Sequence, residues 1–282
     1  MYEIVRKEKL APGIKLFEIK APWVARKAAP GQFIILRVDE TGERIPLTIA
    51  DFNRDKGTVT IVAQEVGYTT KQLGRLEPGD AVLDFTGPLG QPSELPDSGT
   101  VTCIGGGVGI APVYPQVKAL REKGVYVITI VGARSAEYLI FTGELEELSN
   151  EFYIATDDGS RGCKGFVTGV LQELLEADRS IDHVIAIGPV IMMKAVTAIT
   201  RPRNISTTVS LNSLMVDGTG MCGACRVTID GETKFACING PEFDAFKVDF
   251  DEQLRRLSFY RDPEAKAMAK AECRIRNAKG AE

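Results

Sequence analysis

The chain has 282 residues, 44% of them apolar, and a formal net charge of -4. This length predicts two or three domains. No stretch approaches the roughly 18 uninterrupted apolar residues that span a bilayer, and the N-terminus lacks the apolar centre of a signal peptide. We therefore expect a cytoplasmic protein without a membrane segment. Its scattered basic residues exclude a nucleic-acid footprint and favour small molecules and proteins as partners.

The six cysteines and the single histidine limit the possible chemistry. Six cysteines in a cytoplasmic chain indicate metal or redox chemistry before disulfides. A Rieske centre needs two histidines, and a zinc-hydrolase cluster or a Ser-His-Asp triad would depend on His183 alone. His183 begins an apolar strand, so we interpret it as a structural residue.

Residues 1–97 consist of short apolar runs broken by glycine and proline, with no convincing helical period between them. The runs at 13–20, 31–38, 57–66 and 79–90 have the composition of strands. This pattern predicts a small antiparallel β-barrel.

Residues 98–211 alternate between apolar strands and helical stretches. Runs rich in valine and isoleucine, separated by helices, predict a doubly wound parallel sheet in an α/β domain. The expected strands are 100–104, 125–132, 151–156, 183–188 and 206–211, and the expected helices are 111–124, 143–150, 165–178 and 190–200.

The glycine-rich stretch "CIGGGVGIAP", residues 103–112, follows the first of these strands and opens a helix. Pro112 suits a first helical turn, where its missing N–H is not needed. A glycine-rich turn can also be no more than a tight crossover from strand to helix. The position of this turn after the first strand of an alternating domain favours nucleotide binding. Backbone approach to a pyrophosphate at the helix N-terminus would use Gly105, Gly106, Gly107 and Gly109.

This loop resembles that of the ferredoxin-NADP reductase superfamily, where a GGGxGxxP-like loop receives the nicotinamide cofactor. The segment "IGPVIMM", residues 187–193, is similar to the late Cys-Gly-Pro-x-x-Met motif of that superfamily, through Gly188 and Pro189. Ile187 stands where many members have a cysteine near the nicotinamide. The resemblance therefore implies no catalytic thiol here.

The same resemblance implies a flavin site on the barrel. The Arg-x-aromatic-Ser/Thr strand of the superfamily is matched by Arg44, Pro46, Leu47 and Thr48, with Pro-Leu replacing the aromatic residue. A guanidinium suits a diphosphate because it donates paired hydrogen bonds in one plane. The Thr48 hydroxyl is then expected in the catalytic position, near the reactive flavin N5.

A second segment, "EVGYTTKQL", is similar to the Gly-x-Gly-Thr-x-x-Leu phosphate loop of the superfamily. It offers Gly67 and the hydroxyls of Thr69 and Thr70, with nearby backbone amides, although Thr69 replaces the second glycine. The segments "APGQF" (29–33) and "TGPLG" (86–90) complete the barrel signatures. In that superfamily FAD is the flavin that usually accompanies a following nucleotide-binding domain, so the resemblance implies FAD and not FMN.

The adenosine end of the nicotinamide cofactor has conflicting signals after two later strands. Arg134 and Arg161 could bind a 2′-phosphate, whereas Glu137, Asp157 or Asp158 could accept from a free ribose hydroxyl. The family resemblance favours NAD(H), with Asp157 on the ribose.

Residues 212–282 form the third expected domain, which ends in a charged, solvated helix near 262–280. Its centre is "DGTGMCGACRVTIDGETKFAC", in which Asp230-Gly231 is a strong hairpin signal. Counting outward from this turn places Cys225 opposite Ala236. Three thiolates thereby converge, from Cys222, Cys225 and Cys237.

A plant-type [2Fe–2S] site has the spacing Cys-x4-Cys-x2-Cys and a distant fourth cysteine. Asp217 stands where the first cysteine should be, five residues before Cys222. A structural zinc site is the main alternative, but zinc motifs usually pair two Cys-x2-Cys knuckles. Asp217 can also be an ordinary turn residue, since Asp-Gly is frequent in turns. We predict a [2Fe–2S] cluster bound by Asp217, Cys222, Cys225 and Cys237.

The order of the three domains resembles the electron-transfer subunit of dihydroorotate dehydrogenase, which normally has four cysteine ligands. The Asp-for-Cys loop and "CINGPEFDAF" resemble more closely the small subunits of NADH-dependent reduced ferredoxin:NADP oxidoreductases. That resemblance implies a heterodimer in which this subunit exchanges hydride between NAD(H) and FAD and passes single electrons to its cluster. The larger partner would carry a flavin and [4Fe–4S] clusters, meet ferredoxin and NADP(H), and perform electron bifurcation. A dihydroorotate-oxidising partner and a regulatory subunit without turnover remain alternatives.

Overall fold

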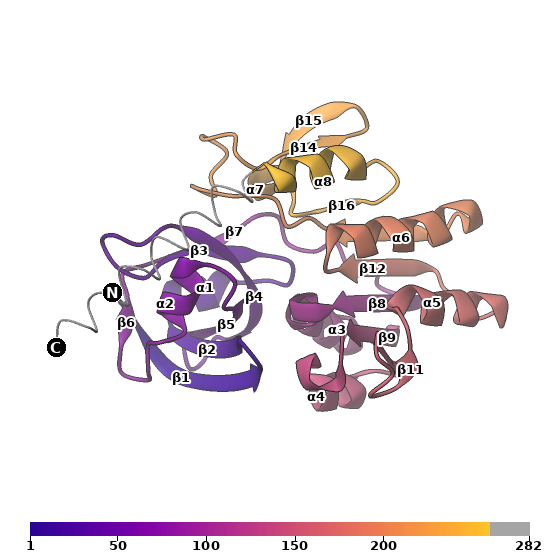
Figure 1. The fold of residues 1–282 in the computed structure, drawn as a ribbon, viewed down its shortest axis with the longest axis horizontal. Coiled ribbons are helices and arrows are strands. Elements are labelled where there is room, and N and C mark those ends of the chain that lie inside the picture. The colour runs from indigo at the N-terminus through magenta and orange to yellow at the C-terminus, as the bar shows by residue number, and fades with distance from the viewer. Residues whose placement is uncertain (260–282) are drawn as a thin grey trace.

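The computed structural model describes residues 1–259, so the predicted helix at 262–280 lies outside the described residues. Figure 1 shows a barrel-like sheet (indigo to purple), a second sheet flanked by helices, and a small C-terminal lobe (orange to yellow) above the space between them. No helix in the described part of the chain is long and apolar enough to cross a membrane.

The N-terminal sheet is an antiparallel near-barrel, which confirms the expected architecture. Its strands follow the order β6-β1-β2-β5-β4-β3-β7. Alternate residues of each strand fill the interior, as the two-residue repeat of a strand requires; the pattern of β2 places Phe17 and Ile19 inside. The strands are β1 (Tyr2–Ala11), β2 (Ile14–Lys20), β3 (Phe33–Arg37), β4 (Ile45–Asn53), β5 (Thr58–Gln64), β6 (Ala81–Val82) and β7 (Asp84–Leu89).

Two short helices interrupt the barrel, α1 (Pro22–Lys27) and α2 (Tyr68–Leu73). The sequence pattern does not predict them, because six residues are too few to display a helical period. Gly67 is the N-cap of α2, and its N–H donates a hydrogen bond to the Thr70 hydroxyl at 3.0 Å.

The second sheet confirms the doubly wound architecture. The strands follow the order β11-β10-β9-β8-β12-β13 and are parallel. Their central residues are mostly valine and isoleucine with buried side chains. The strands are β8 (Thr100–Gly106), β9 (Tyr126–Ala133), β10 (Glu151–Thr156), β11 (Cys163–Lys164), β12 (His183–Ile187) and β13 (Ser206–Ser210), and the helices are α3 (Ile110–Glu122), α4 (Thr142–Leu148), α5 (Val167–Glu176) and α6 (Val190–Thr200).

One strand of this sheet comes from the C-terminal segment, which sequence reasoning missed. The strand β16 (Glu242–Asp244) pairs antiparallel with β13, so the sheet is mixed at this edge. A three-residue strand carries no pattern of its own, because its place is decided by a distant partner. The segment also contains the helices α7 (Ala236–Asn239) and α8 (Phe250–Ser258).

The cysteine hairpin has the predicted register. Strand β14 (Arg226–Ile229) pairs with β15 (Glu232–Phe235), Ile229 facing Glu232. The turn residues Asp230 and Gly231 have φ values of 55° and 76°, the left-handed conformation that a tight hairpin requires. The Ala236 N–H donates to the Cys225 carbonyl at 3.0 Å, which confirms the predicted position of Cys225.

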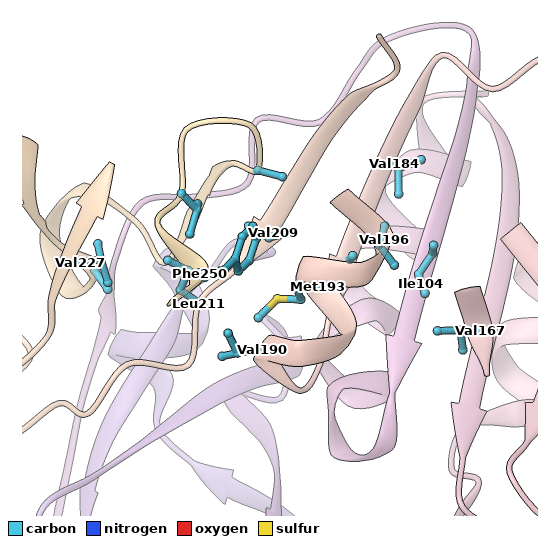
Figure 2. Close-up of a cluster of buried hydrophobic side chains, with 14 of the residues drawn as sticks. Ile104, Val167, Val184, Val190, Met193, Val196, Val209, Leu211, Val227 and Phe250 are labelled. Atoms are coloured by element: carbon cyan, nitrogen blue, oxygen red, sulfur yellow. The ribbon is translucent and has the colours of Figure 1, made fainter. Parts of the chain in front are cut away.

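A continuous apolar core joins the second sheet to the C-terminal lobe. Figure 2 shows Ile104 and Val184 on one side of Met193 from α6, and Val209, Leu211 and Phe250 on the other. The same cluster includes Phe33 and Ile35 of the barrel and Val227 of the hairpin. Dense packing of this kind resists relative movement of the parts that share it.

Candidate functional site

A cavity of about 670 Å³ lies between the barrel and the second sheet. The barrel contributes residues of β3 and β4, and the second sheet contributes the loops at the carboxyl ends of β8 and β12. In open α/β sheets ligands bind at this edge. Of the residues predicted from the sequence, the cavity brings together Pro46, Thr48, Gly106, Gly107, Gly109, Gly188 and Pro189. We call it the main cavity.

The alternation of β4 decides which flavin-motif residues reach the main cavity. Pro46 and Thr48 face it, while Ile45 and Leu47 pack on the barrel core. The Thr48 hydroxyl has no hydrogen-bond partner within residues 1–259, so it is available to a ligand. The Leu47 side chain, which we expected at the cofactor, lies outside the cavity.

The predicted diphosphate residues gather beside α2, away from the lining of the main cavity. The buried Thr69 hydroxyl lies 3.3 Å from a Glu43 carboxylate oxygen, which places the neighbouring Arg44 near the first turn of α2. Arg44 is exposed and has no ion-pair partner in the described part of the chain. Because the hydroxyls of Thr69 and Thr70 are already engaged, the backbone amides of this turn and Arg44 remain for an anion.

The glycine loop owes its shape to close backbone contacts. Gly107 has φ +58° and open space around it, so its backbone faces the cavity unshielded. A Cβ on Gly109 would lie 2.7 Å from the Gly188 Cα and closer still to the Ile187 carbonyl oxygen. Gly105, in contrast, is buried under Ile110 and takes no part in the cavity wall.

A second cavity of about 480 Å³ shares Gly106, Gly107 and Pro189 with the main cavity and extends to Asp157. The Asp157 carboxylate has no hydrogen-bond partner among the described residues. Asp158 differs, since its carboxylate accepts from the Ser160 N–H at 2.9 Å and from the Ser160 hydroxyl, which lowers the Asp158 pKa. Of these two carboxylates, Asp157 is the one positioned for a ligand.

Both arginines weighed for a 2′-phosphate have partners within the protein. Arg134 lines both cavities, and its guanidinium stacks 3.8 Å from the centre of the Tyr138 ring. Arg161 donates to the Thr142 hydroxyl at 3.3 Å and lies outside both linings.

The hairpin brings two of the predicted cluster thiols into contact. The sulfur atoms of Cys225 and Cys237 are 3.2 Å apart, and both residues are buried. Burial, and then the neighbouring Cys225, raise the pKa of Cys237 to about 12, so a metal that binds there must displace a proton. Cys222 is exposed on the same loop.

The Asp217 side chain closes the cysteine loop by accepting hydrogen bonds from backbone amides of that loop. One carboxylate oxygen accepts from the Thr219 N–H at 2.9 Å and the other from the Cys222 N–H at 2.8 Å, which lowers the Asp217 pKa. Within residues 1–259 no three Cys, His, Asp or Glu side chains enclose a metal ion. The turn role of Asp217 is therefore visible, and its ligand role stays a prediction.

The donor set nevertheless suits an iron–sulfur cluster. Three thiols and one carboxylate lie on one glycine-rich loop and its hairpin. Cys237 is close enough to both sides of the loop that the Gly220 amide lowers its pKa and the Asp217 carboxylate raises it. The loop packs directly on the barrel, since a Cβ on Gly218 would lie 2.8 Å from a Leu89 methyl. The candidate cluster loop thus lies against the barrel.

Residues 210–215 form part of the main cavity wall, which sequence reasoning missed. This segment runs from β13 to the cluster loop and contributes Ser210, Asn212, Ser213 and Met215 to the lining. The buried Ser213 hydroxyl is fixed by a hydrogen bond from Gln253 Nε2 at 3.0 Å. No motif marks the segment; its position between a sheet strand and the cysteine loop is its only signal.

Two regions of the chain match described protein families. Residues 212–249 match the iron–sulfur cluster binding domain of dihydroorotate dehydrogenase B. Residues 103–198 match the oxidoreductase NAD-binding domain. The first region contains the cysteine loop and hairpin, and the second contains the glycine loop.

The whole chain also has similar relatives. It is 49% identical to the dihydroorotate dehydrogenase B (NAD+) electron transfer subunit homolog of Thermotoga maritima, over 93% of this chain and 92% of the relative. It is 51% identical to an uncharacterized protein of Clostridium beijerinckii, over 96% and 95%. A chain from a structure of NADH-dependent reduced ferredoxin-NADP oxidoreductase, solved to study flavin-based electron bifurcation, matches with a TM-score of 0.92 and 46% identity, over 97% of this chain and 98% of that chain.

Fold, cavities and matches together define an oxidoreductase subunit that binds FAD and NAD and carries an iron–sulfur cluster for electron transfer. The chain belongs to the family of dihydroorotate dehydrogenase B electron-transfer subunits and their homologues, and is of the type found in NADH-dependent ferredoxin-NADP oxidoreductase. The predicted class and cofactors are thereby confirmed. An electron-transfer subunit implies a catalytic partner subunit.

Substitution of Gly109 by alanine tests the glycine loop. Its Cβ would collide with the backbone at Ile187 and Gly188, so the loop must shift, and we expect the Kd for NADH to rise about tenfold. Gly169→Ala is the matched control, because Gly169 lies in α5 with nothing within 4 Å of its Cβ position. Titration of NADH followed by fluorescence measures both variants, and unchanged binding in Gly109→Ala would contradict the assignment.

Proposed function

We propose that this chain exchanges hydride between NAD(H) and FAD in the main cavity and passes single electrons through a [2Fe–2S] cluster to a larger flavin and [4Fe–4S] subunit, in NADH-dependent ferredoxin:NADP oxidoreduction with electron bifurcation. The observation that carries this proposal is the shared wall of the main cavity. Thr48, the glycine loop and the segment that leads to the cysteine loop all line it.

Bound FAD would supply the conversion of a two-electron hydride into single electrons. The protein supplies binding and orientation. The Thr48 hydroxyl would donate to the flavin ring, and Arg44 with the first-turn amides of α2 would hold its diphosphate. Gly107 and the N-terminus of α3 would receive the pyrophosphate of the nicotinamide cofactor. The buried side chains of Leu211 and Met215 would give this wall of the cavity an apolar part.

The second cavity supports NAD(H) as the hydride donor. A free Asp157 carboxylate accepts hydrogen bonds from ribose hydroxyls and repels a 2′-phosphate. Arg134 also belongs to that lining and is stacked on Tyr138. The free carboxylate of Asp157 is therefore the feature that favours NADH over NADPH.

The proposed cluster ligands are Asp217, Cys222, Cys225 and Cys237. We further propose the functional units 1–97 for FAD, 98–211 for NAD(H) and 212–282 for the cluster, with β16 of the third unit completing the sheet of the second. Contact between Gly218 and Leu89 supports this order, since it sets the cluster loop directly on the flavin barrel.

The surface around the cluster loop supports a large partner subunit. Met221 is 90% exposed beside Cys222, and Ile238 and, on the segment that leads to the loop, Leu214 and Val216 are also exposed. Ile238 belongs to the same patch, because a Cβ on Gly220 would lie 2.8 Å from its Cγ1. Exposed apolar patches mark protein interfaces, and an electron acceptor must approach the cluster closely.

A dihydroorotate-oxidising partner is the second candidate. It is favoured by the match of residues 212–249 to the cluster domain of dihydroorotate dehydrogenase B. The electron-transfer chemistry of this subunit would be the same, and only the partner and its substrate would differ.

Anaerobic copurification with the native partner tests the proposal. We expect a brown complex with flavin and cluster absorption, NADH oxidation with an artificial acceptor, and a flavin and [4Fe–4S] partner in the mass spectrum. This chain purified alone should contain two irons. A colourless chain with one zinc would refute it. Both cofactors without NADH oxidation would indicate a regulatory subunit, and a dihydroorotate-oxidising partner would establish the second candidate.

Substitutions of Asp217 separate its ligand and turn roles. Asparagine keeps one of the two acceptor oxygens that the Thr219 and Cys222 amides use and is a poorer metal ligand, so we expect Asp217→Asn to lose iron. Asp217→Cys should retain the cluster with an altered EPR spectrum and redox potential, and Asp217→Ala should lose or weaken it. Asp55→Asn, at an exposed turn of the barrel, is the control. An unchanged spectrum and potential in the asparagine and cysteine variants would leave Asp217 as a turn residue.

A charge at Met221 tests the docking face. Met221→Glu should weaken the complex at least tenfold, about 1.4 kcal/mol, because docking would bury an unpaired carboxylate. Iron and flavin contents should not change, since the side chain is exposed. Val5→Glu is the control, because Val5 is another exposed apolar residue and lies on strand β1, which Figure 1 shows at the bottom of the barrel, away from the C-terminal lobe. Analytical ultracentrifugation with the partner measures both, and equal affinities would show that the partner docks elsewhere.

A further inference from the structure

The carboxylate of Glu242 joins three separate parts of the molecule. It accepts a hydrogen bond from the Ser93 hydroxyl at 2.9 Å and another from Gln116 Nε2. Gln116 Nε2 also donates to the Ser93 hydroxyl at 3.2 Å. Glu242 lies on β16, Gln116 on α3 and Ser93 on the segment between the two sheets. We call these three residues the junction.

The junction is tied to the barrel through backbone. The Ser93 N–H donates to the Pro30 carbonyl at 2.9 Å. Gly31, with φ +83°, approaches so closely that a Cβ there would lie 2.9 Å from Glu242 Oε1. The barrel, the interdomain segment and β16 therefore meet without space between them.

The junction is also one residue away from the main cavity. Pro241, next to Glu242, lines that cavity, and its carbonyl accepts from the Leu211 N–H at 2.8 Å. Gln116 lies on α3, whose N-terminal end carries the glycine loop. A change at Glu242 thus reaches both the cavity wall and the helix that would receive the nicotinamide cofactor.

Glu242 has no cationic partner among residues 1–259. Burial raises its pKa to about 7, against the opposing effect of the bonds from Ser93 and Gln116. The other titratable side chain that interacts with it is Cys103 of β8, a buried thiol whose pKa is raised by burial and by Glu242, so that it stays neutral. The carboxyl group therefore changes charge near neutral pH, where the ionised and neutral forms make different hydrogen bonds.

Gln116 offers a partner to each form. The ionised carboxylate accepts from Nε2, and such charge-assisted bonds are strong. The neutral acid carries a proton that needs an acceptor, and Gln116 Oε1 is buried without a partner in the described part of the chain. Rotation of the amide would present this oxygen to the acid.

We propose that Glu242 is a positioning residue for hydride transfer, which through Ser93 and Gln116 sets α3 and the cavity wall against the barrel in an arrangement that depends on its protonation. This inference rests on the proposed role of the main cavity. Sub-ångström placement of reacting groups has large effects on rate, so a rearranged junction changes the rate of hydride transfer.

Stopped-flow reduction of the flavin by NADH across pH 5.5–8.5 tests the positioning role. We expect the wild-type rate to rise about tenfold through an inflection near pH 7, because the ionised carboxylate accepts charge-assisted hydrogen bonds from both Ser93 and Gln116. Glu242→Gln should keep the low-pH rate at every pH. Glu94→Gln, an exposed glutamate on the same segment, should behave as wild type. An inflection that persists in Glu242→Gln overturns the proposal.

Thermal unfolding of the same proteins without NADH provides a second test of Glu242, which does not depend on hydride transfer. Because the pKa of Glu242 is higher in the folded state than in the unfolded state, the protonated group stabilises the folded protein. This contribution to the free energy of unfolding is fully present below the unfolded-state pKa and is lost as pH rises through about 7. Between pH 5 and 7.5 the wild-type Tm should fall by roughly 5 °C more than that of Glu242→Gln. Identical profiles overturn the proposal.

Ser93→Ala covers the case in which Glu242→Gln does not fold. It removes a bond that lowers the Glu242 pKa, so both inflections should move to higher pH, and unmoved inflections overturn the proposal. A chain without flavin reduction by NADH would refute the proposed function, and the thermal profiles would then still decide whether Glu242 titrates at the junction.

Discussion

The pairing of β16 with β13 holds the cysteine-bearing segment on the rest of the molecule. Ser210 faces Glu242 and Thr208 faces Asp244 across this ladder, so the chain from 211 to 241 is closed at both ends. The entropy lost on closing a loop rises only slowly with the number of residues in it. Pairing at both ends can therefore hold this long segment in place, while the hairpin of β14 and β15 brings Cys225 to Cys237.

This closure explains why the main cavity has walls from three parts of the chain. The segment that leaves β13 lines the cavity before it reaches the cysteine loop, and the loop then packs on Leu89 of the barrel. The apolar core around Met193 extends from the second sheet into the C-terminal lobe (Figure 2). A densely packed frame of this kind fixes the separation of redox centres, which single-electron transfer requires.

Much of the fold could be read from local pattern. The strand at 151–156 and the helix at 190–200 have the expected bounds, because each displays its period over its whole length. The hairpin register followed from Asp230-Gly231 alone. The short elements α1, α2 and β16 could not be read, since three to six residues show no period and depend on distant contacts. In the site, Leu47 fits the motif by sequence, yet the alternation of β4 turns its side chain into the barrel core.

The sequence by itself determined the order of cofactor-binding segments, the glycine loop and the convergence of Cys225 with Cys237, because each depends on neighbours within about twenty residues. Only the tertiary structure decided which of those residues share a cavity. It placed Thr48 and the glycine loop in the lining of one cavity, left the Asp157 carboxylate free while Asp158 accepts from Ser160, and joined Glu242 to Ser93 and Gln116. The Glu242 contacts join residues 149 and 126 positions apart in the sequence, and chain folding, not local propensity, brings such groups together.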